Sequence, residues 1–477
     1  MNQTIDQWID KNKETIIASL QELLKYRSVN EGASEKDAPF GRTIEECLEY
    51  YLGLAESMGF ATKNVDGYAG CVDCGSGEQT MGIMCHLDVV PEGKGWTHPP
   101  FGGEIADGRI YGRGTLDDKG PAIAALYALK AIRECGIELD KKVRIIAGCN
   151  EETGMKCLKY YKEHEPIPDF SISPDGRFPM TSSEKSMVFG KYRADFSSKI
   201  SIKGGSAHNT IPGEAEAFVP FPKAAVEKAV FAFTESDRKR SEGNAFMMEY
   251  PFGFTLTEKD GGTHILCTGL QSHAANPHEG RNALQALMNM IALLPLEGDD
   301  AEYLGKLMKY LRMDTYGEQF DLDVEDESGR LTMNVGVLDW NEKGYVLDLD
   351  VRAPIVCITE EEVRTKMKTC MANAGAEEIY FDYDMGYSIP DDSEFVQTVL
   401  GVFRERTGLK DALPHHIGGG TYSRMFPMAV SFGPERYMCE SLDHSIDEFI
   451  GVDQLIFNVK IIADVILAFC RKKTEDK

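Results

Sequence analysis

Three short clusters of acidic and histidine side chains point to metal-dependent chemistry. The pair Glu151–Glu152 follows an apolar run over residues 143–149, and His86-Leu-Asp88 follows another over residues 81–85. A third cluster, Asp117-Asp118-Lys119, lies between them. Adjacent carboxylates on a tight turn repel one another unless a cation is bound beside them. Histidine and carboxylate side chains in such clusters are typical of hydrolases that use a divalent ion.

These clusters require strands that deliver them to one edge of a sheet. The two apolar runs have the length and composition of buried strands. Ligands of open α/β sheets bind beyond the carboxyl ends of the strands, where the pattern places the three clusters. Asp175, in Ser-Ile-Ser-Pro-Asp-Gly, follows another short apolar run and fits the same edge. We therefore expect an α/β fold with a mixed, mostly parallel sheet between helices.

The donor set favours zinc, manganese or cobalt over calcium or magnesium, because imidazole is a borderline ligand. The number of carboxylates is high for one ion, and two ions bridged by one carboxylate would account for it. One of the paired glutamates would then ligate a metal while its neighbour accepts a proton from the attacking water. We expect two divalent ions as cofactors, with zinc as the first choice and manganese or cobalt as alternatives.

Each cluster alone has a plainer interpretation. A histidine after a strand usually has a structural role, Asp-Asp-Lys before a helix often caps it, and Glu-Glu is often solvated surface. Cys71-Val-Asp-Cys74 lacks the second pair that a structural zinc site requires, so we interpret it as a hairpin with two thiols. Gly112-Arg-Gly114 is not followed by the GKS or GKT of a phosphate loop. The joint placement of the acidic clusters at successive strand ends favours the metal site.

Composition and charge limit the class of protein. The chain has 477 residues, which is too long for one ordinary core. Its formal net charge of −26 repels phosphate backbones and excludes nucleic acid as an expected partner. We expect no membrane span, because no apolar run approaches about 20 residues, and no secretory signal, because the N-terminal pattern is an amphipathic helix. These features predict a cytoplasmic protein with reduced cysteines.

The pattern of elements divides the chain into two domains. Strands and helices alternate up to residue 185, and the clearest helix is predicted from Pro121 to Cys135, with Gly136 after its end. The following segment lacks dense acidic turns, and the strand–helix pattern returns near residue 383. We predict a discontinuous metal-binding catalytic domain, residues 1–185 with 383–477, and an inserted α+β lid domain, residues 186–382.

The order of the motifs resembles a known family over nearly the whole chain. It is similar to the co-catalytic zinc aminoacylase/carboxypeptidase family of metallopeptidases. The matching motifs are His86-x-Asp88, Gly112-Arg-Gly-Thr-Leu-Asp117-Asp-Lys119-Gly, Asn150-Glu-Glu-Thr-Gly154 and Pro174-Asp175-Gly176. Within the family, the chain resembles the PepV-type bacterial dipeptidases, which cleave Xaa-His and other dipeptides. That closer resemblance comes from the long insert, Gly418-Gly-Gly-Thr-Tyr-Ser423 and Ser441-Leu-Asp-His444.

The resemblance implies a role for each residue of the metal centre. The ligands would be Asp117 as the bridge between both ions, His86 and Asp175 at one ion, and Glu152 and His444 at the other. Glu151 would be the general base, which later passes its proton to the leaving amine. Asp88 would orient His86 and raise its basicity.

The resemblance also implies substrate contacts from the insert. His273 would polarise the scissile carbonyl and stabilise the developing oxyanion, while Asn209 and Arg352 would contact the substrate. Backbone N–H groups of the run Gly418, Gly419, Gly420 and Thr421 would bind a free C-terminal carboxylate. Closure of the lid would assemble the site and exclude water. Because the insert is long enough for one chain to supply both halves, we expect a functional monomer, with a dimer as the alternative.

Three functions remain in competition at this point. A dipeptidase acting on small peptides is the leading hypothesis, and an N-acyl amino acid deacylase or desuccinylase would use the same ions with a different pocket. A non-catalytic binding protein on the same fold predicts loss of Glu151 or of a ligand, and all are present. His208 and His278 are interpreted as structural, because neither has a matching acidic partner in its motif. The pair His415–His416, just before the glycine turn, is interpreted as part of a loop, with tuning of the substrate pocket as the alternative.

Overall fold

The computed structural model describes residues 1–33, 38–435 and 442–472. The Cα positions group into two compact units. Unit 1 comprises residues 1–183, 388–415 and 420–477, and unit 2 comprises residues 184–387 and 416–419. The mixed α/β fold class expected from the sequence is confirmed. The assignment of a catalytic role to one part and a lid role to the other stays a prediction.

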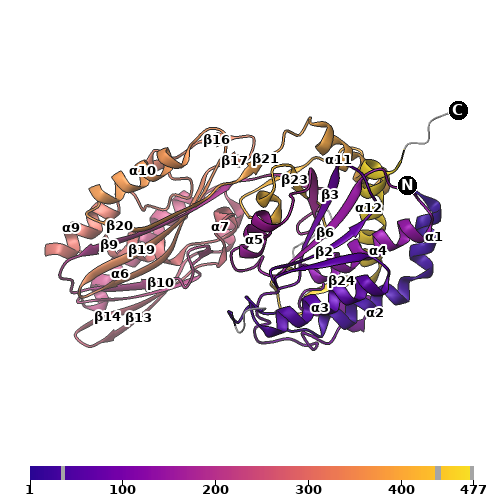
Figure 1. The fold of residues 1–477 in the computed structure, drawn as a ribbon. Coiled ribbons are helices and arrows are strands. Elements are labelled where there is room, and N and C mark those ends of the chain that lie inside the picture. Colours follow the sequence, from indigo (N-terminus) through magenta and orange to yellow (C-terminus); the bar gives the residue numbers. More distant parts are fainter. Residues whose placement is uncertain (34–37, 436–441, 473–477) are drawn as a thin grey trace. The chain divides into compact units, whose positions relative to one another are not determined.

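Unit 1 is built on a mixed sheet with the strand order β1-β2-β6-β3-β7-β23-β8. Figure 1 labels β2, β6, β3 and β23 of this sheet. The bounds are β1 (Ala61–Val65), β2 (Ala69–Cys74), β3 (Thr80–His86), β6 (Lys142–Gly148), β7 (Phe170–Ser173), β8 (Thr181–Glu184) and β23 (Ala429–Ser431). The central strands β6, β3, β7 and β23 are parallel. Strands β1, β2 and β8 pair antiparallel with their neighbours. The parallel centre matters for function because its carboxyl ends share one edge.

The helices of unit 1 pack against one another and against the sheet. Their bounds are α1 (Gln3–Lys11), α2 (Lys13–Leu24), α3 (Arg42–Ser57), α4 (Lys119–Glu134), α5 (Lys156–His164), α11 (Glu394–Thr407) and α12 (Val452–Cys470). Helix α4 packs against α12, α2, β3 and β6. It begins two residues before the predicted Pro121. The N-terminal segment, predicted as one helix, forms two helices that separate at Asn12. The side-chain amide of Asn12 donates a hydrogen bond to the Trp8 carbonyl over 2.7 Å.

Unit 2 is built on an antiparallel sheet with the order β13-β14-β12-β10-β18-β19-β9-β20. The bounds are β9 (Ser186–Asp195), β10 (Ser201–Gly204), β12 (Glu214–Val219), β13 (Gly253–Lys259), β14 (Gly262–Thr268), β18 (Thr332–Asn341), β19 (Gly344–Ala353) and β20 (Glu377–Asp384). In β9 buried residues alternate with more exposed ones, as expected for a strand with one face on a core.

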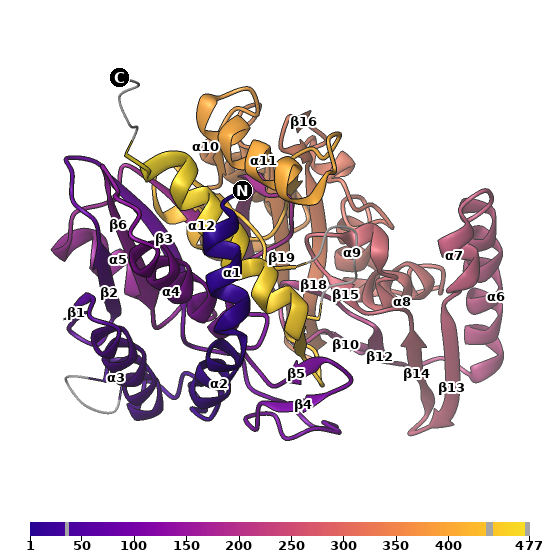
Figure 2. The same cartoon turned by 90° about the vertical axis from the view of Figure 1, so that its right-hand side faces the viewer.

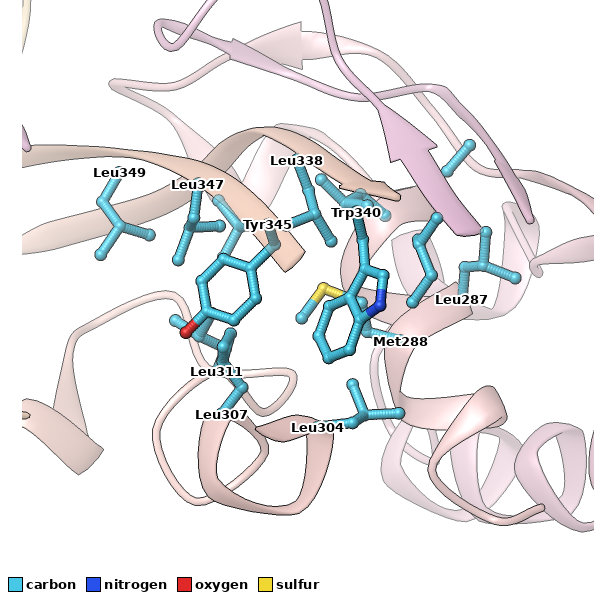
Figure 3. Close-up of a cluster of buried hydrophobic side chains, with 14 of the residues drawn as sticks. Leu287, Met288, Leu304, Leu307, Leu311, Leu338, Trp340, Tyr345, Leu347 and Leu349 are labelled. Atoms are coloured by element: carbon cyan, nitrogen blue, oxygen red, sulfur yellow. The ribbon is translucent and has the colours of Figure 1, made fainter. Parts of the chain in front are cut away.

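Helices cover the core of unit 2. Their bounds are α6 (Lys223–Arg240), α7 (Ala245–Glu249), α8 (Ala283–Ile291), α9 (Gly298–Leu307) and α10 (Glu360–Asn373). Helix α6 packs against β13 and α8 (Figure 2). Trp340 and Tyr345 stack at a centroid distance of 5.2 Å among leucines that include Leu304 and Leu307 (Figure 3). This core gives unit 2 a rigid support for the loops that follow its strands.

The remaining elements are short. They are β4 (Glu104–Ala106), β5 (Arg109–Tyr111), β11 (Thr210–Ile211), β15 (Ser272–His273), β16 (Glu325–Asp326), β17 (Gly329–Arg330), β21 (Tyr387–Ser388), β22 (His415–Ile417), β24 (Phe449–Gly451) and the 3-10 turns η1 (Pro277–Glu279), η2 (Glu318–Phe320) and η3 (Tyr422–Met425). Among the helices described, none is long and apolar enough to span a membrane. Cys71 and Cys74 are free thiols on β2, which forms a hairpin with β1.

Candidate metal centre

Three adjacent parallel strands carry candidate ligands to one edge of the unit 1 sheet. His86 is the last residue of β3, Glu151 and Glu152 lie in the turn after β6, and Asp175 lies in the turn after β7. Since β6, β3 and β7 are neighbours, these turns meet at the same edge. Asp117 comes from the turn between β5 and α4, and His444 from the segment before β24.

The candidate ligands lie within a few ångströms of one another. Nε2 of His86 is 2.8 Å from Oδ1 of Asp117 and 3.8 Å from Oδ2 of Asp175. Nε2 of His444 is 3.1 Å from Oδ2 of Asp117 and 3.0 Å from Oε2 of Glu152. Asp117 therefore faces a different histidine with each of its two oxygens. Two groups of side chains have the spacing to hold a metal ion: His86, Asp117 and Glu152, and His86, Glu151 and Asp175.

The orientation of His86 is fixed from its other ring nitrogen. Nδ1 lies 2.9 Å from the main-chain carbonyl oxygen of Asp88, which can only accept a hydrogen bond. Nδ1 therefore carries the proton, and a neutral His86 directs the lone pair of Nε2 toward Asp117. A lone pair and a carboxylate oxygen 2.8 Å apart repel each other unless a proton or a metal ion lies between them.

The carboxylate of Asp88 binds the backbone of the turn after β6. Its two oxygens accept hydrogen bonds from the backbone N–H groups of Glu151 (3.0 Å) and Glu152 (3.2 Å). Its Oδ1 is 3.6 Å from Nδ1 of His86. Asp88 thus links two neighbouring strand ends: its carbonyl orients the histidine after β3, and its carboxylate holds the turn after β6.

Asp118 and Lys119 do not serve as a side-chain cap for α4. The Asp118 carboxylate is buried and accepts a hydrogen bond from the backbone N–H of His86 over 3.0 Å. It makes no capping hydrogen bond at the helix start. The Lys119 ammonium donates to the Tyr26 carbonyl over 2.6 Å. The alternative interpretation of Asp-Asp-Lys as a helix cap is therefore not supported, because the Asp118 and Lys119 side chains bind His86 and Tyr26 instead.

Sequence reasoning missed the side chain that holds the Asp117 turn. Glu448 is fully buried and accepts hydrogen bonds from the backbone N–H groups of Gly114, Leu116 and Asp117. Arg113 pairs with its other oxygen at 2.6 Å. Burial and the nearby Asp117 raise the pKa of Glu448 to about 7. No local signal in the sequence reveals this role, because Glu448 and Asp117 are 331 positions apart.

The site concentrates negative charge in a buried place. Burial and the neighbouring Asp175 raise the pKa of Glu151 well above its usual value. Burial and Asp117 raise the pKa of Asp175 to about 8. The pKa of Asp117 is lowered in spite of its burial, because the imidazole rings of His444 and His86 face its two oxygens. The arrangement is one that a bound cation would stabilise.

A glycine at the end of β6 lets an aromatic ring approach the site. A Cβ on Gly148 would lie 2.0 Å from the hydroxyl oxygen of Tyr422. The buried Tyr422 hydroxyl contacts Sγ of Cys157 at 2.9 Å, and its ring packs edge-on against His86. Any larger residue at position 148 would displace this ring, which forms part of the wall behind His86.

Two of the predicted substrate residues lie on one small ladder of unit 2. Asn209 precedes β11, and His273 ends β15, which pairs with β11 through Thr210 and His273. The Asn209 carbonyl accepts a hydrogen bond from the N–H of Ala274 over 2.9 Å. Nδ1 of His273 accepts a hydrogen bond from the N–H of Ala275 over 3.1 Å. A neutral His273 therefore carries its proton on Nε2.

Arg352 and Gly418 meet in the same unit. The buried Arg352 guanidinium donates to both oxygens of Asp350, over 2.7 Å and 3.0 Å, and to the carbonyl of Gly418 over 3.0 Å. Nδ1 of His208 lies 2.9 Å from the second oxygen of Asp350. His208, interpreted above as structural, thus has an acidic partner outside its own motif. Gly418 and Gly419 belong to unit 2, and Gly420 and Thr421 to unit 1.

We predict that Asp350→Asn destabilises the protein by about 3 kcal/mol, because it leaves the buried Arg352 charge without its partner. Arg352 and His208 lower the pKa of Asp350 in spite of its burial. Its ionised form therefore contributes fully at neutral pH, and the contribution is lost as the pH falls below about 4. Urea unfolding at pH 7 and at acidic pH measures both effects, and the variant's deficit should shrink on acidification.

Asp348→Asn is the matched control. Asp348 lies on the same strand and faces the partly exposed Lys191 at 3.5 Å. Its replacement should cost less than about 1 kcal/mol, because burial raises the pKa of Asp348 and so disfavours the charge that asparagine lacks, while its partner Lys191 keeps contact with solvent. Equal losses of unfolding free energy from the two substitutions would show that the Asp350–Arg352 pair stabilises the protein no more than the Asp348–Lys191 pair does.

The comparisons with known proteins decide the family. Residues 82–468 match the model of Peptidase family M20/M25/M40, which is well over half of the chain. The chain belongs to peptidase family M20/M25/M40. Membership makes it a hydrolase, and the resemblance to metallopeptidases inferred from the motifs is confirmed. The ligand-type clusters described above lie in the matched segment.

Relatives in the M20/M25/M40 family cover the chain nearly end to end. A Bacillus subtilis protein named "Putative dipeptidase YtjP" is 33% identical over 467 residues, which are 96% of this chain and 97% of that protein. A Beta-Ala-Xaa dipeptidase of Lactobacillus delbrueckii is 30% identical over 475 residues, 96% of each chain. The fold also resembles the solved structure of an aminoacylhistidine dipeptidase from Vibrio alginolyticus, with a TM-score of 0.54, 15% identity and coverage of 96% and 97%.

Proposed function

We propose that the protein is a dipeptidase that uses two divalent ions to hydrolyse the peptide bond of dipeptides with a free C-terminal carboxylate. The observation that carries the proposal is the pair of histidines on the two oxygens of Asp117, at 2.8 Å and 3.1 Å. A single carboxylate facing two separate ligand groups suits two ions. The names of the relatives, which include a Beta-Ala-Xaa dipeptidase, support dipeptides as the substrate class.

The donor set passes a direct test of fit for metal ions. Nε2 of His86, Oδ1 of Asp117 and Oε1 of Glu152 are buried, and none has a hydrogen-bond partner in the described part of the chain. Buried polar atoms without partners are costly, and convergent ones are explained by an ion that binds them together. We assign Asp117, His86 and Asp175 to one ion and Asp117, Glu152 and His444 to the other, with zinc as the preferred metal.

Glu151 is the proposed general base. When bound, the ions lower the pKa of a water so that it attacks the peptide carbonyl at neutral pH. The Glu151 carboxylate accepts the proton of that water and later gives it to the nitrogen of the leaving amine. The Asp88 carboxylate holds the backbone of Glu151 and keeps the side chain in the turn after β6. Because Glu152 follows directly, one turn supplies both a base and a ligand.

His273 is the proposed donor to the developing oxyanion. Its Nδ1 accepts from the Ala275 N–H, so a neutral ring offers the Nε2 proton to an acceptor. His273 is exposed on unit 2, which suits a side chain that meets a substrate. Asn209, on the neighbouring strand end, and Arg352 are proposed as further substrate contacts. The backbone N–H groups of residues 418–421 are proposed to bind the substrate carboxylate.

The substrate class is tested by hydrolysis of a mixed panel with the zinc-loaded protein. The panel contains dipeptides such as β-Ala-His, the matching tripeptides, N-acetyl and N-succinyl amino acids, and dipeptide amides. We expect cleavage of the dipeptides alone, since both ends of a short substrate would be recognised. Cleavage confined to the N-acyl amino acids would transfer the protein to the deacylases. Equal cleavage of dipeptides and their amides would remove the carboxylate-binding role of residues 418–421.

We predict that His273→Ala lowers kcat for a dipeptide by about 100-fold or more, the usual effect of removing an oxyanion donor. The metal content should not change, because His273 belongs to a different unit from the candidate ligands. Steady-state kinetics with metal analysis checks both statements. His264→Ala, which removes another exposed histidine of unit 2, is the control and should leave kcat as it is. An unchanged kcat in His273→Ala would exclude this residue from the reaction.

A further inference from the structure

Unit 2 contains a cavity of about 250 Å³ that the proposed reaction does not use. It lies among α7, η1, the start of α8 and the segment 313–316. Its apolar wall includes Phe246, Met247, Phe252, Met313 and Met333. The volume suits a ligand of a few heavy atoms, smaller than the drug-sized molecules that occupy pockets of about 300–1,000 Å³.

A buried cation without full hydrogen bonding lies at this cavity. Arg281 lines it and is 3% exposed. One of its terminal nitrogens donates to Oδ2 of Asp237 over 2.6 Å, and the guanidinium stacks over Phe252 at 4.2 Å. Its Nε is buried and has no hydrogen-bond partner among the described residues. A buried guanidinium with incomplete hydrogen bonding is costly, and an anionic oxygen in the cavity would offset its charge.

The charges around the cavity are not balanced. Arg240 also lines it and pairs with the other oxygen of Asp237. Two guanidinium groups thus share one carboxylate, which leaves one net positive charge at the cavity. Burial, partly offset by Asp237, lowers the pKa of Arg281, which is the direction expected for a cation with incomplete compensation. The residues that line the cavity include no aspartate or glutamate.

We propose that this cavity is a binding site for a small carboxylate with a short apolar chain. The carboxylate would pair with Arg281, and the chain would occupy the wall formed by the methionines and phenylalanines. A neutral molecule of the same shape would not offset the charge of the Arg281 guanidinium. The proposal goes beyond the hydrolytic function and does not depend on it.

The site also lies behind the ladder that carries Asn209 and His273. Ile211 of β11 lines the cavity and pairs with Ser272 of β15. Asn334, another lining residue, donates hydrogen bonds to the carbonyls of His208 and Thr210 over 3.0 Å each. A ligand in the cavity would therefore contact β11, the strand that pairs with β15.

The test follows methyl NMR signals of 13C-methionine-labelled, metal-loaded protein during titration with isocaproate. We expect saturable shifts of the Met313 and Met333 methyls with a Kd of about 1 mM or tighter, the range accessible to so small a ligand. Met371, buried on α10 away from the cavity lining, should not shift. Isocaproamide, the neutral analogue, should leave all three signals unchanged at the same concentration.

Two variants keep the test decisive. Thr315→Trp fills the cavity from its lining and leaves the Arg281–Asp237 pair in place, so it should abolish the isocaproate shifts. Arg281→Gln removes the charge and should do the same, although it also breaks a buried ion pair. Equal shifts with isocaproamide would overturn the proposal, as would shifts that persist in Thr315→Trp or the absence of any shift in the wild type.

Discussion

Glu151→Gln should lower kcat for dipeptide hydrolysis by about 1,000-fold or more while the protein keeps its full metal content. Proton transfer by a positioned base contributes about 100-fold to 10,000-fold to a rate, and no other side chain in the turn after β6 is free for the task. Glu152 faces His444 at 3.0 Å and is occupied as a proposed ligand. Glutamine preserves the size of the side chain and removes only its ability to accept the proton. A discontinuous activity assay and elemental analysis of the same sample measure kcat and the metal content.

The contrary outcome for Glu151 has a structural meaning. Glu151 also belongs to a group with His86 and Asp175 that has the spacing to hold an ion. A parallel loss of metal and activity would therefore make Glu151 a ligand and leave the base unassigned. Glu163→Gln on α5 is the matched control, because it makes the same chemical change at an exposed position. It should leave both activity and metal content unchanged.

Asp117→Asn should remove both ions and reduce activity below detection. Asp117 faces His86 with one oxygen and His444 with the other, so each proposed ion loses a carboxylate ligand. The amide also loses the negative charge that offsets two cations. We expect less than about 0.2 equivalents of metal after dialysis, since each proposed ion loses a charged ligand. Elemental analysis of the dialysed protein measures the stoichiometry.

The control for Asp117 is Asp107→Asn, in the turn between β4 and β5. Asp107 has a φ of 51°, a conformation that asparagine adopts readily, and its side chain is exposed. This variant should bind metal and hydrolyse dipeptides as the wild type does. Retention of one full equivalent of metal by Asp117→Asn would argue that Asp117 serves a single ion and that the bridging assignment is incorrect.

The parts of the fold that could be predicted are those in which local pattern and tertiary structure agree. Helix α4 has an apolar sequence with proline near its start, and it is buried on nearly all sides. The turns after β3, β6 and β7 could be predicted because each acidic motif follows directly on an apolar strand. The parallel pairing of those strands then brings His86, Glu151 and Asp175 together without further information.

The parts that could not be predicted depend on distant contacts. Glu448 holds the Asp117 turn from the far end of the chain, and its sequence context, Asp-Glu-Phe, resembles any surface segment. The Asp88 carbonyl orients His86, and the Asp88 carboxylate accepts a hydrogen bond from the backbone N–H of Glu151. These partners depend on the direction of the backbone, which cannot be predicted from residue types alone. The cavity at Arg281 likewise depends on a distant contact. Asp237 of α6 pairs with Arg240 of the same helix and with Arg281, which precedes α8.

The most direct test of the account is a metal titration of the stripped protein that follows bound zinc and β-Ala-His hydrolysis together. The account predicts two equivalents of zinc bound per chain and activity that reaches its maximum only when both sites are filled. The reason for that number is that Asp117 faces His86 with one carboxylate oxygen and His444 with the other. Full activity with one equivalent, or without added metal, would contradict the dinuclear centre proposed for the ends of β3, β6 and β7.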